Sequence, residues 1–269
     1  MLRVAICQVN GERGKVDENL LAVECLVAER AGDADLFCFP ELYREGYTCS
    51  VEEFRTLAEE ADGASSLRMR ACAKKHSVYI AYGYAEKAEN GSIYNAGQVV
   101  SPEGNLLLNY RKTHLYDPFM VHERVIFDSG EALSDIVDIN GFKCALLICW
   151  DVELPEICRV LAVRGARCFI VLTANGSDLT NNVTVRSRAI ENNSFMIYAN
   201  RVGSDNSFTF NGQSVAYAPN GSCISILSKT KEECIVATLD NSKEENLKFV
   251  AANPLLLDRR PELYRDLVN

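Results

Sequence analysis

The stretch LLICWDVELPE (residues 146–156) predicts the central corner of the fold. An apolar run, Ala145 to Ile148, leads into Cys149, and an apolar-periodic segment follows Pro155. This pattern is typical of a buried strand that stops abruptly and continues into a helix. Cys149 then lies at the carboxyl end of a strand, where open α/β sheets bind ligands, and near a helix N-terminus, which favours a thiolate. Cys149 is therefore either a nucleophile or a small buried hydrophobic residue.

The composition is that of an ordinary soluble chain. The 269 residues are 48% hydrophobic, and a formal net charge of −9 argues against nucleic-acid and anionic-membrane partners. The 11 cysteines show no regular spacing, which predicts free thiols in a reducing cytoplasm rather than disulfides or a zinc site. A strand-like run begins at Met1, and no apolar run reaches about 18 residues. We therefore expect neither a signal peptide nor a membrane-spanning helix.

Strand-like and helix-like segments alternate along the chain. Apolar runs predict strands at 2–9, 34–40, 77–86, 168–174 and 194–202, hairpins at 94–112 and 135–149, and three more strands within 213–239. Helical patterns fall at 17–31, 50–61, 64–76, 154–164 and 180–193. Asp17 is the expected cap of the first helix, and Ser50 with Glu53 forms a capping box for the second. Residues 113–131 have no clear period and are predicted to form an ordered loop.

This order of elements predicts an α/β fold with mixed sheets, in which two sheets carry helices on their outer sides. No linker or repeat divides the chain, so residues 1–269 are predicted to form one domain. The charged tail, about 240–269, is expected to pack on a neighbouring element or a partner subunit.

A nucleophilic Cys149 needs a base. Histidine is the common choice, and His114 and His122 lie in the 113–131 loop, but no papain-like or caspase-like signature surrounds the cysteine. A carboxylate is the alternative. Glu41 follows the apolar strand FCFP, and Lys112 closes the strand LLLNYRK, although each could be an ordinary loop residue. Together they suit a mechanism in which Glu41 accepts the thiol proton and Lys112 stabilises an oxyanion.

Three stretches resemble the motifs of one family. FPELYREGY (39–47), YRKTHLYD (110–117) and ICWDVELPE (148–156) are similar in order and spacing to the Glu, Lys and Cys motifs of the nitrilase, or carbon–nitrogen hydrolase, superfamily. The resemblance covers nearly the whole chain. It implies a four-layer α-β-β-α sandwich, a homodimer or higher homo-oligomer, and a mechanism without cofactor or metal.

The resemblance also implies roles for individual residues. Glu41 would be the general base, Cys149 the nucleophile and Lys112 the oxyanion stabiliser, with the backbone N–H of Trp150 as a second oxyanion donor. Glu123, in HERVIFDSG (122–130), matches the family's second glutamate and would hold Lys112 or position the substrate amine.

The stretches ICWDVELPE and TANGSDLTNNVTVRSRAIEN (173–192) resemble the aliphatic-amidase branch, which implies a small carboxamide substrate. Trp150 departs from the tyrosine common in that branch and resembles N-carbamoylputrescine amidases, so a carbamoyl substrate stays open. A thiol acyltransferase and a non-catalytic scaffold are further alternatives.

The remaining candidates have two interpretations each. Tyr43 and Tyr47 either line the pocket or pack in the core, and Asn175 either meets the substrate or caps a turn. Arg188 and Glu191 are predicted to form an ion pair along a helix.

Overall fold

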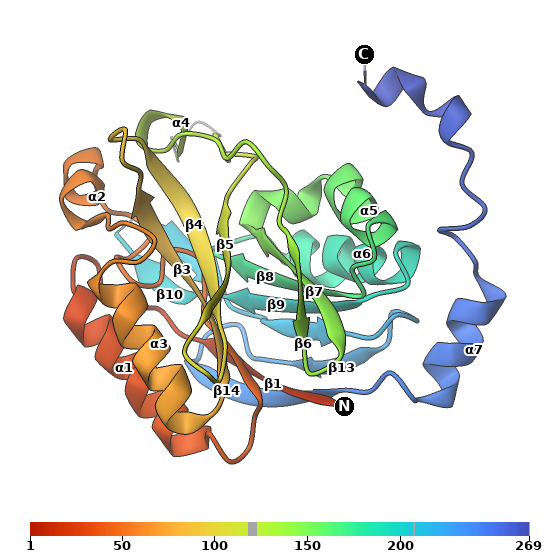
Figure 1. Cartoon of the computed structure of the whole chain (residues 1–269), viewed down its shortest axis with the longest axis horizontal. Coiled ribbons are helices and arrows are strands. Elements are labelled where there is room, and N and C mark those ends of the chain that lie inside the picture. The colour runs from red at the N-terminus through yellow and green to blue at the C-terminus, as the bar shows by residue number, and fades with distance from the viewer. Residues whose placement is uncertain (118–122, 207, 269) are drawn as a thin grey trace.

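Two six-stranded sheets lie face to face, and helices cover their outer sides (Figure 1). The structure is a computed structural model that describes residues 1–117, 123–206 and 208–268. Both sheets mix parallel and antiparallel neighbours, as the sequence predicts.

The first sheet carries three parallel strands at its centre, β1, β2 and β3. Antiparallel strands extend it on both sides. In spatial order it contains β14 (Glu233–Leu239), β1 (Leu2–Gln8), β2 (Leu36–Cys38), β3 (Tyr79–Lys87), β4 (Ile93–Val100) and β5 (Leu106–Arg111).

The second sheet has the same plan, with parallel β7, β8 and β9 at its centre. In spatial order it contains β13 (Cys223–Ile226), β12 (Val215–Tyr217), β9 (Phe195–Asn200), β8 (Cys168–Thr173), β7 (Phe142–Ile148) and β6 (Ile136–Ile139). A separate two-stranded ribbon joins β10 (Val202–Asp205) to β11 (Phe208–Asn211).

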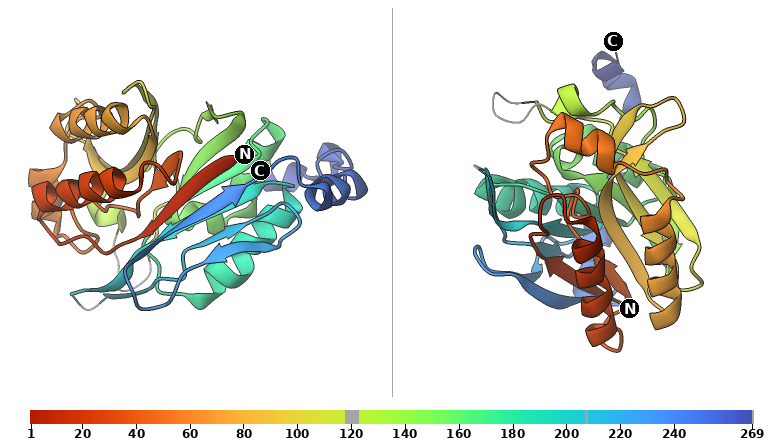
Figure 2. Two further views of the ribbon diagram at one scale, coloured as in Figure 1. Left: turned by 90° about the horizontal axis from the view of Figure 1, so that it is seen from below. Right: turned by 90° about the vertical axis from the view of Figure 1, so that its left-hand side faces the viewer.

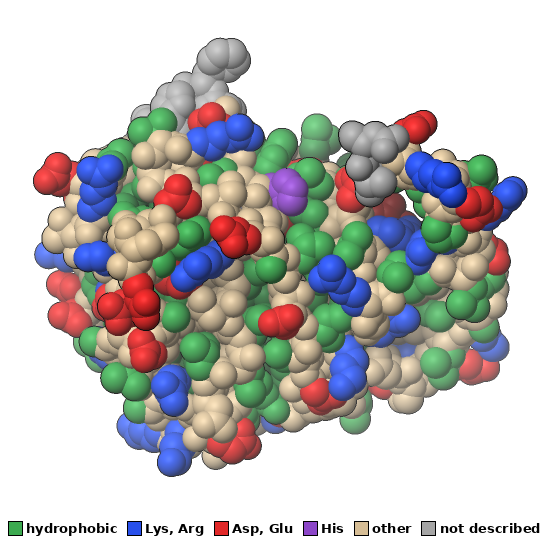
Figure 3. Space-filling view, turned by 45° about the horizontal axis from the view of Figure 1, so that its top comes forward, with side chains coloured by type: hydrophobic (Ala, Val, Ile, Leu, Met, Phe, Trp, Pro, Cys, Tyr) green, Lys and Arg blue, Asp and Glu red, His purple; other side chains and the backbone are tan. Residues whose placement is uncertain are grey.

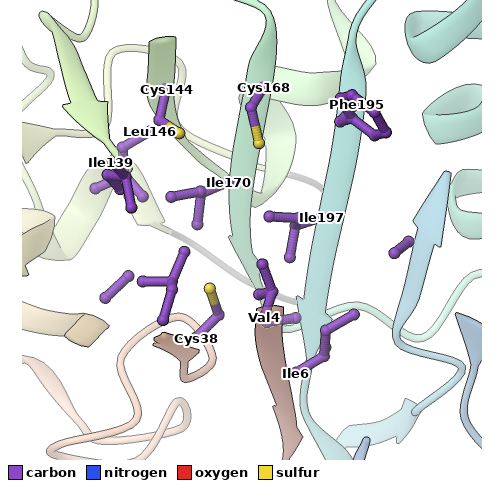
Figure 4. Packing of buried hydrophobic residues seen from close by; sticks show 14 of the residues in the cluster. Val4, Ile6, Cys38, Ile139, Cys144, Leu146, Cys168, Ile170, Phe195 and Ile197 are labelled. Carbon is purple, nitrogen blue, oxygen red and sulfur yellow. The ribbon is translucent and has the colours of Figure 1, made fainter. Parts of the chain in front are cut away.

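The main core lies between the two sheets. Along β1, Leu2, Val4 and Ile6 face the second sheet, whereas Ala5 and Cys7 face the helices, because successive strand residues point to opposite sides. Figure 4 shows Val4 and Ile6 approaching aliphatic residues of the second sheet. Strands buried on both faces explain why the sequence shows nearly continuous apolar runs rather than alternation.

Helices form the two outer layers, as both views in Figure 2 show. The first sheet packs against α1 (Val16–Arg30) and α3 (Ala64–His76). The second packs against α5 (Pro155–Val163) and α6 (Val185–Glu191). The layers therefore run α-β-β-α, and the predicted fold class is confirmed.

Several local predictions are confirmed. The hairpin between β6 and β7 turns at Asn140 and Gly141, whose φ angles of 50° and 82° are those of a turn that favours Asn-Gly. Ser50 and Glu53 form the capping box of α2 (Val51–Leu57). Arg188 and Glu191 pair at 2.9 Å.

Other predictions are wrong in detail. Asp17 does not cap α1: the helix begins at Val16, its N-cap is Lys15, and the Asp17 side chain is 94% exposed beside Arg68. The helix predicted at 50–61 ends at Leu57, because Glu59 bonds instead to the backbone of β3.

Several elements were not predicted. The loop 113–131 contains a single helical turn, α4 (Glu123–Ile126). The helix predicted at 180–193 begins with a wide π turn, Thr180–Thr184, before α6. The predicted strand 194–202 divides into β9 and β10, and the partner strand β11 was missed.

The tail contains α7 (Glu244–Ala252) and two short 3₁₀ turns, Pro261–Leu263 and Arg265–Val268. It extends along one side of the molecule (Figure 1) and exposes Leu257, Leu263 and Leu267. Its packing on a partner subunit stays a prediction.

Acidic and basic side chains are interspersed on the face shown in Figure 3. Within the described part of the chain, no helix is long and apolar enough to cross a membrane.

Candidate active site

Cys149 stands at the carboxyl end of β7 in a left-handed backbone conformation, with φ of 43°. The chain then forms a 3₁₀ turn, Cys149–Glu153, and α5 begins only at Pro155. Arg188 of α6 donates to the carbonyls of Val152 and Glu153 at 3.0 and 2.8 Å. The helix thus holds the turn that presents the cysteine.

Asp151 ties this turn to the strand end that carries Lys112. Its carboxylate accepts from the Ile148 N–H at 3.0 Å and from the Tyr110 hydroxyl at 2.9 Å. Its other oxygen accepts from the Thr113 hydroxyl at 3.2 Å. Asp151 is fully buried, so these bonds fix the turn Cys149–Glu153, here called the cysteine corner, against residues 110–113.

Glu41 lies three residues after the end of β2 and precedes a left-handed residue, Leu42, with φ of 46°. The backbone here is pressed against Gly83 of β3: a Cβ at position 83 would lie 2.6 Å from the Leu42 nitrogen and 2.8 Å from the Glu41 Cα. From the other side, buried Arg201 donates to the carbonyls of Glu41 and Leu42 at 3.4 and 3.2 Å.

Lys112 follows β5 and joins two carboxylates. Its Nζ lies 2.8 Å from Glu41 Oε1 and 2.8 Å from both carboxylate oxygens of Glu123. Asn95 of β4 donates to Glu41 Oε1 at 2.7 Å. Glu41 Oε2 is buried and accepts no hydrogen bond from the described residues. That oxygen is therefore the free acceptor of the Glu41 carboxylate.

The charges of this cluster shift one another's pKa values. Burial raises the pKa of Glu41 above its ordinary value, against the lowering effect of Lys112, because Glu123 adds a second negative charge. Burial alone would lower the pKa of Lys112, but Glu123 and Glu41 together raise it well above its ordinary value. Lys112 is thus the permanent cation of the cluster.

Burial and the Glu41 carboxylate also raise the pKa of the Cys149 thiol, and Lys112 offsets this only in part. The expectation that a helix N-terminus favours a thiolate is therefore wrong for the resting protein. The physical reason is that Cys149 starts a short 3₁₀ turn rather than α5, and it is buried beside a carboxylate. A neutral thiol requires a base to activate it.

A cavity of about 600 Å³ opens on Cys149. Its wall is formed by four segments: the cysteine corner, the segment after β8, the π turn and the β10–β11 ribbon. The lining residues are Tyr116, Cys149, Trp150, Glu153, Ala174, Asn175, Gly176, Ser177, Leu179, Thr180, Thr184, Phe208 and Thr209.

The predicted pocket residues fall in different places. Trp150 lines the cavity, is 38% exposed, and packs against Tyr116 with ring centroids 4.8 Å apart. Asn175 lines the cavity and also caps a turn, because its Oδ1 accepts from the Ser177 N–H at 2.6 Å. Tyr47 is buried behind Glu123, to which its hydroxyl donates at 3.2 Å.

Tyr43 packs against Phe39 in the core and does not line the cavity. His114 contacts Thr113 and Asp151 rather than the cavity, and His122 lies outside the described residues. Among the described residues, no group of histidine, cysteine, aspartate and glutamate side chains is arranged to hold a metal ion.

Comparison with known proteins identifies the family. The sequence profile described as carbon–nitrogen hydrolase matches residues 3–249. The chain belongs to the carbon–nitrogen hydrolase family. The predicted superfamily and the predicted enzyme class, a carbon–nitrogen hydrolase, are both confirmed.

Individual relatives of this carbon–nitrogen hydrolase include a Pseudomonas protegens protein described as "Hydrolase in pqqF 5'region", 40% identical over 99% of this chain and 92% of that one. An (R)-stereoselective amidase of a Pseudomonas species is 34% identical over 82% of this chain and 78% of its own. A solved variant of an amidase from Nesterenkonia sp. AN1 superposes with a TM-score of 0.83, at 26% identity over 98% of this chain and 96% of that one. In that structure, the acetamide moiety of fluoroacetamide is covalently added at the active-site cysteine of the amidase.

Sequence reasoning missed four residues that hold Glu41 or the turn at Cys149. Asn95, Gly83, Arg201 and Asp151 position the backbone or side chain of Glu41 or of the cysteine corner. Each residue gave only a weak sequence signal. Asn95 and Gly83 are single residues within strands, Arg201 directly follows a strand, and Asp151 is an acid next to Trp150. Only Asp151, inside the Cys149 motif, stood where a search for partners of the cysteine could have found it.

Proposed function

We propose that this carbon–nitrogen hydrolase is an amidase that cleaves a small aliphatic carboxamide through a thioester on Cys149. The observation that carries the proposal is the convergence of three strand ends. Lys112 bridges two buried carboxylates, one of which is Glu41, and the charges of Lys112 and Glu41 both act on the thiol of Cys149, which opens to the cavity.

The proposed reaction starts from the neutral thiol. Glu41 accepts the proton of Cys149 on its free Oε2, and the sulfur attacks the amide carbon. The resulting oxyanion is stabilised by Lys112 and by the backbone N–H of Trp150. Glu41 then returns the proton to the departing ammonia, which leaves an acyl thioester on Cys149.

The second half repeats the use of Glu41. The carboxylate takes a proton from a water molecule, the water oxygen attacks the thioester, and the acid leaves as the thiol is restored. Glu123 keeps Lys112 in place through two bonds of 2.8 Å. The raised pKa of Glu41 suits a group that must both accept and return a proton.

A carbamoyl amine is the second candidate substrate, because Trp150 on the cavity wall resembles the tryptophan of N-carbamoylputrescine amidases. The same steps would then release carbon dioxide as well as ammonia. The eleven free cysteines support our proposal that the enzyme works in the reducing cytoplasm. The family resemblance supports a homodimer, which the mass in solution would test.

The test is a panel of short amides, N-carbamoyl amines and nitriles scored for ammonia and carbon dioxide. We predict ammonia without carbon dioxide from the amides. Cys149→Ala should lower this activity by about 10⁵-fold or more, because no other group forms the thioester. Cys25→Ala, at an exposed cysteine of α1, is the matched control and should keep full activity. Full activity in Cys149→Ala, or a panel without any ammonia, would overturn the proposal.

A further inference from the structure

One carboxylate in the cavity has no part in the proposed mechanism. Glu153 ends the 3₁₀ turn that starts at Cys149, and both residues line the same cavity. Of the described lining residues, Glu153 is the one with a charged side chain. The other polar groups there, such as Asn175, Ser177 and Thr209, are neutral. The cavity wall therefore carries a net negative charge.

Glu153 is held in a defined position. Thr180 donates to its Oε1 at 2.5 Å and Thr184 donates to its Oε2 at 3.0 Å. These threonines are the first and last residues of the π turn before α6. The wide turn thus directs two hydroxyls at one carboxylate, and such turns are frequent at functional sites.

No cation neutralises this carboxylate within the described part of the chain. The nearby Arg188 guanidinium is engaged by the carbonyls of Val152 and Glu153 and by the Glu191 carboxylate. Each Glu153 oxygen accepts one threonine hydrogen bond and keeps capacity for another, because a carboxylate oxygen has two lone pairs. A half-buried carboxylate with free acceptor sites and no paired cation favours a positively charged ligand group.

We propose that Glu153, positioned by Thr180 and Thr184, binds an ammonium group at the far end of the substrate, so that the preferred substrates are ω-amino carboxamides. This proposal rests on the proposed amidase function and specifies its substrate class. A terminal ammonium donates to the free lone pairs of Glu153. A terminal carboxylate meets an uncompensated like charge and is disfavoured. The overall charge of −9 acts in the same direction on approach.

The geometry of the turn limits the length of the substrate. A 3₁₀ helix rises about 2.0 Å per residue, so the backbones of Cys149 and Glu153 are separated by on the order of 8 Å along the turn. A spacer of a few methylene groups between the amide and the ammonium spans such a separation. The paired rings of Tyr116 and Trp150 offer those methylenes an apolar wall.

The first experiment uses the unmodified enzyme and three amides with the same methylene spacer. These are hexanamide, with a terminal methyl group, 5-aminopentanamide, with an ammonium, and adipamate, with a carboxylate. We expect kcat/KM to be about 10- to 100-fold higher for 5-aminopentanamide than for hexanamide, because a hydrogen bond between charged groups stabilises the bound state by that factor. The value for adipamate should be the lowest of the three. Equal values for all three, or a preference for adipamate, would overturn the proposal.

Two variants assign the preference to Glu153. In Glu153→Gln the ratio of kcat/KM between 5-aminopentanamide and hexanamide should fall to near one. In Glu153→Lys the order of 5-aminopentanamide and adipamate should reverse, a gain that misfolding cannot produce. Glu156→Gln, an exposed acid on α5 that does not line this cavity, should keep the original ratio. An unchanged order in Glu153→Lys would show that Glu153 does not select the charge.

The same series separates this proposal from the broader one. If hexanamide and other short amides are hydrolysed but the ammonium gives no advantage, the ammonium site is wrong and the amidase function stands. If the unmodified enzyme hydrolyses no amide at all, the amidase function itself is wrong.

Discussion

The ends of β2 and β7 are built alike and used differently. A proposed catalytic residue follows each parallel strand: Glu41 lies three residues after the end of β2, and Cys149 directly follows β7. Each corner has a left-handed residue, Leu42 or Cys149 itself, with φ of 46° and 43°. Glu41 is 0% exposed and sits in a network of charged and amide side chains. Cys149 is 8% exposed and opens on a cavity lined mainly by neutral groups.

In the proposed mechanism, the buried β2 corner supplies the base, whereas the β7 corner faces the cavity that selects the substrate. At the β2 corner, the charges of Glu41, Lys112 and Glu123 are buried away from water, which strengthens the interactions between them. The stability of the protein therefore depends on keeping these charges paired. The β7 corner places Cys149, the proposed nucleophile, beside a cavity whose loops can vary without disturbing the charged residues at the β2 corner. The two corners should therefore respond differently to substitution.

The largest contrast is expected between Lys112→Met and Cys149→Ala. Removing Lys112 leaves two buried carboxylates without their cation, so unfolding should become easier by about 3–5 kcal/mol, and activity should also be lost. Cys149→Ala should abolish activity while changing the free energy of unfolding by about 1 kcal/mol or less. Denaturant unfolding of both variants measures the contrast. Equal losses of unfolding free energy in the two variants would mean that the buried charge cluster does not stabilise the fold more than Cys149 does.

A smaller effect is expected from Gly83→Ala, which tests whether close backbone contact positions Glu41. The new Cβ would meet the Leu42 nitrogen and the Pro40 oxygen at 2.6 and 2.7 Å, so the β2 corner must move. We predict a loss of about 10²-fold in kcat/KM, since catalysis is sensitive to displacements of about 1 Å. The control is Gly32→Ala, where a Cβ has no neighbour within 4 Å. A fully active Gly83→Ala enzyme would argue against this role.

The smallest effect concerns pH. Only the carboxylate form of Glu41 can accept the thiol proton, and burial raises its pKa. Activity should therefore fall as the pH drops through a midpoint above the ordinary glutamate value of about 4.3. Because Glu123 adds to the rise, Glu123→Gln should move this midpoint to lower pH. Profiles of kcat/KM against pH measure both midpoints, and an upward shift in the variant would contradict the assignment.

Much of the fold could be predicted because its signals are local. The Asn140-Gly141 hairpin and the Ser50–Glu53 capping box depend on neighbouring residues, and the inter-sheet strands on short apolar runs. The ribbon β10–β11 was missed because its strands are short and polar, with Gly203 and Ser204 in the first. The end of α2 was missed because pairing with β3, far along the sequence, outweighs helical propensity.

The candidate site divides in the same way. Glu41, Lys112 and Cys149 could be proposed because each follows a strand within a motif similar to those of a known family. Asn95 could not, because it is 54 residues from the Glu41 that it contacts and is a single amide within a strand. Glu153 could not either, since its significance depends on Thr180 and Thr184 reaching it from a later segment.

The most direct test is mass spectrometry of the enzyme quenched in acid during turnover of a short amide, combined with ammonia release by Cys149→Ala. We predict an added mass equal to the acyl group on the peptide that contains Cys149, and no ammonia from the variant. An acyl group on another residue, or full ammonia release by Cys149→Ala, would contradict the thioester mechanism.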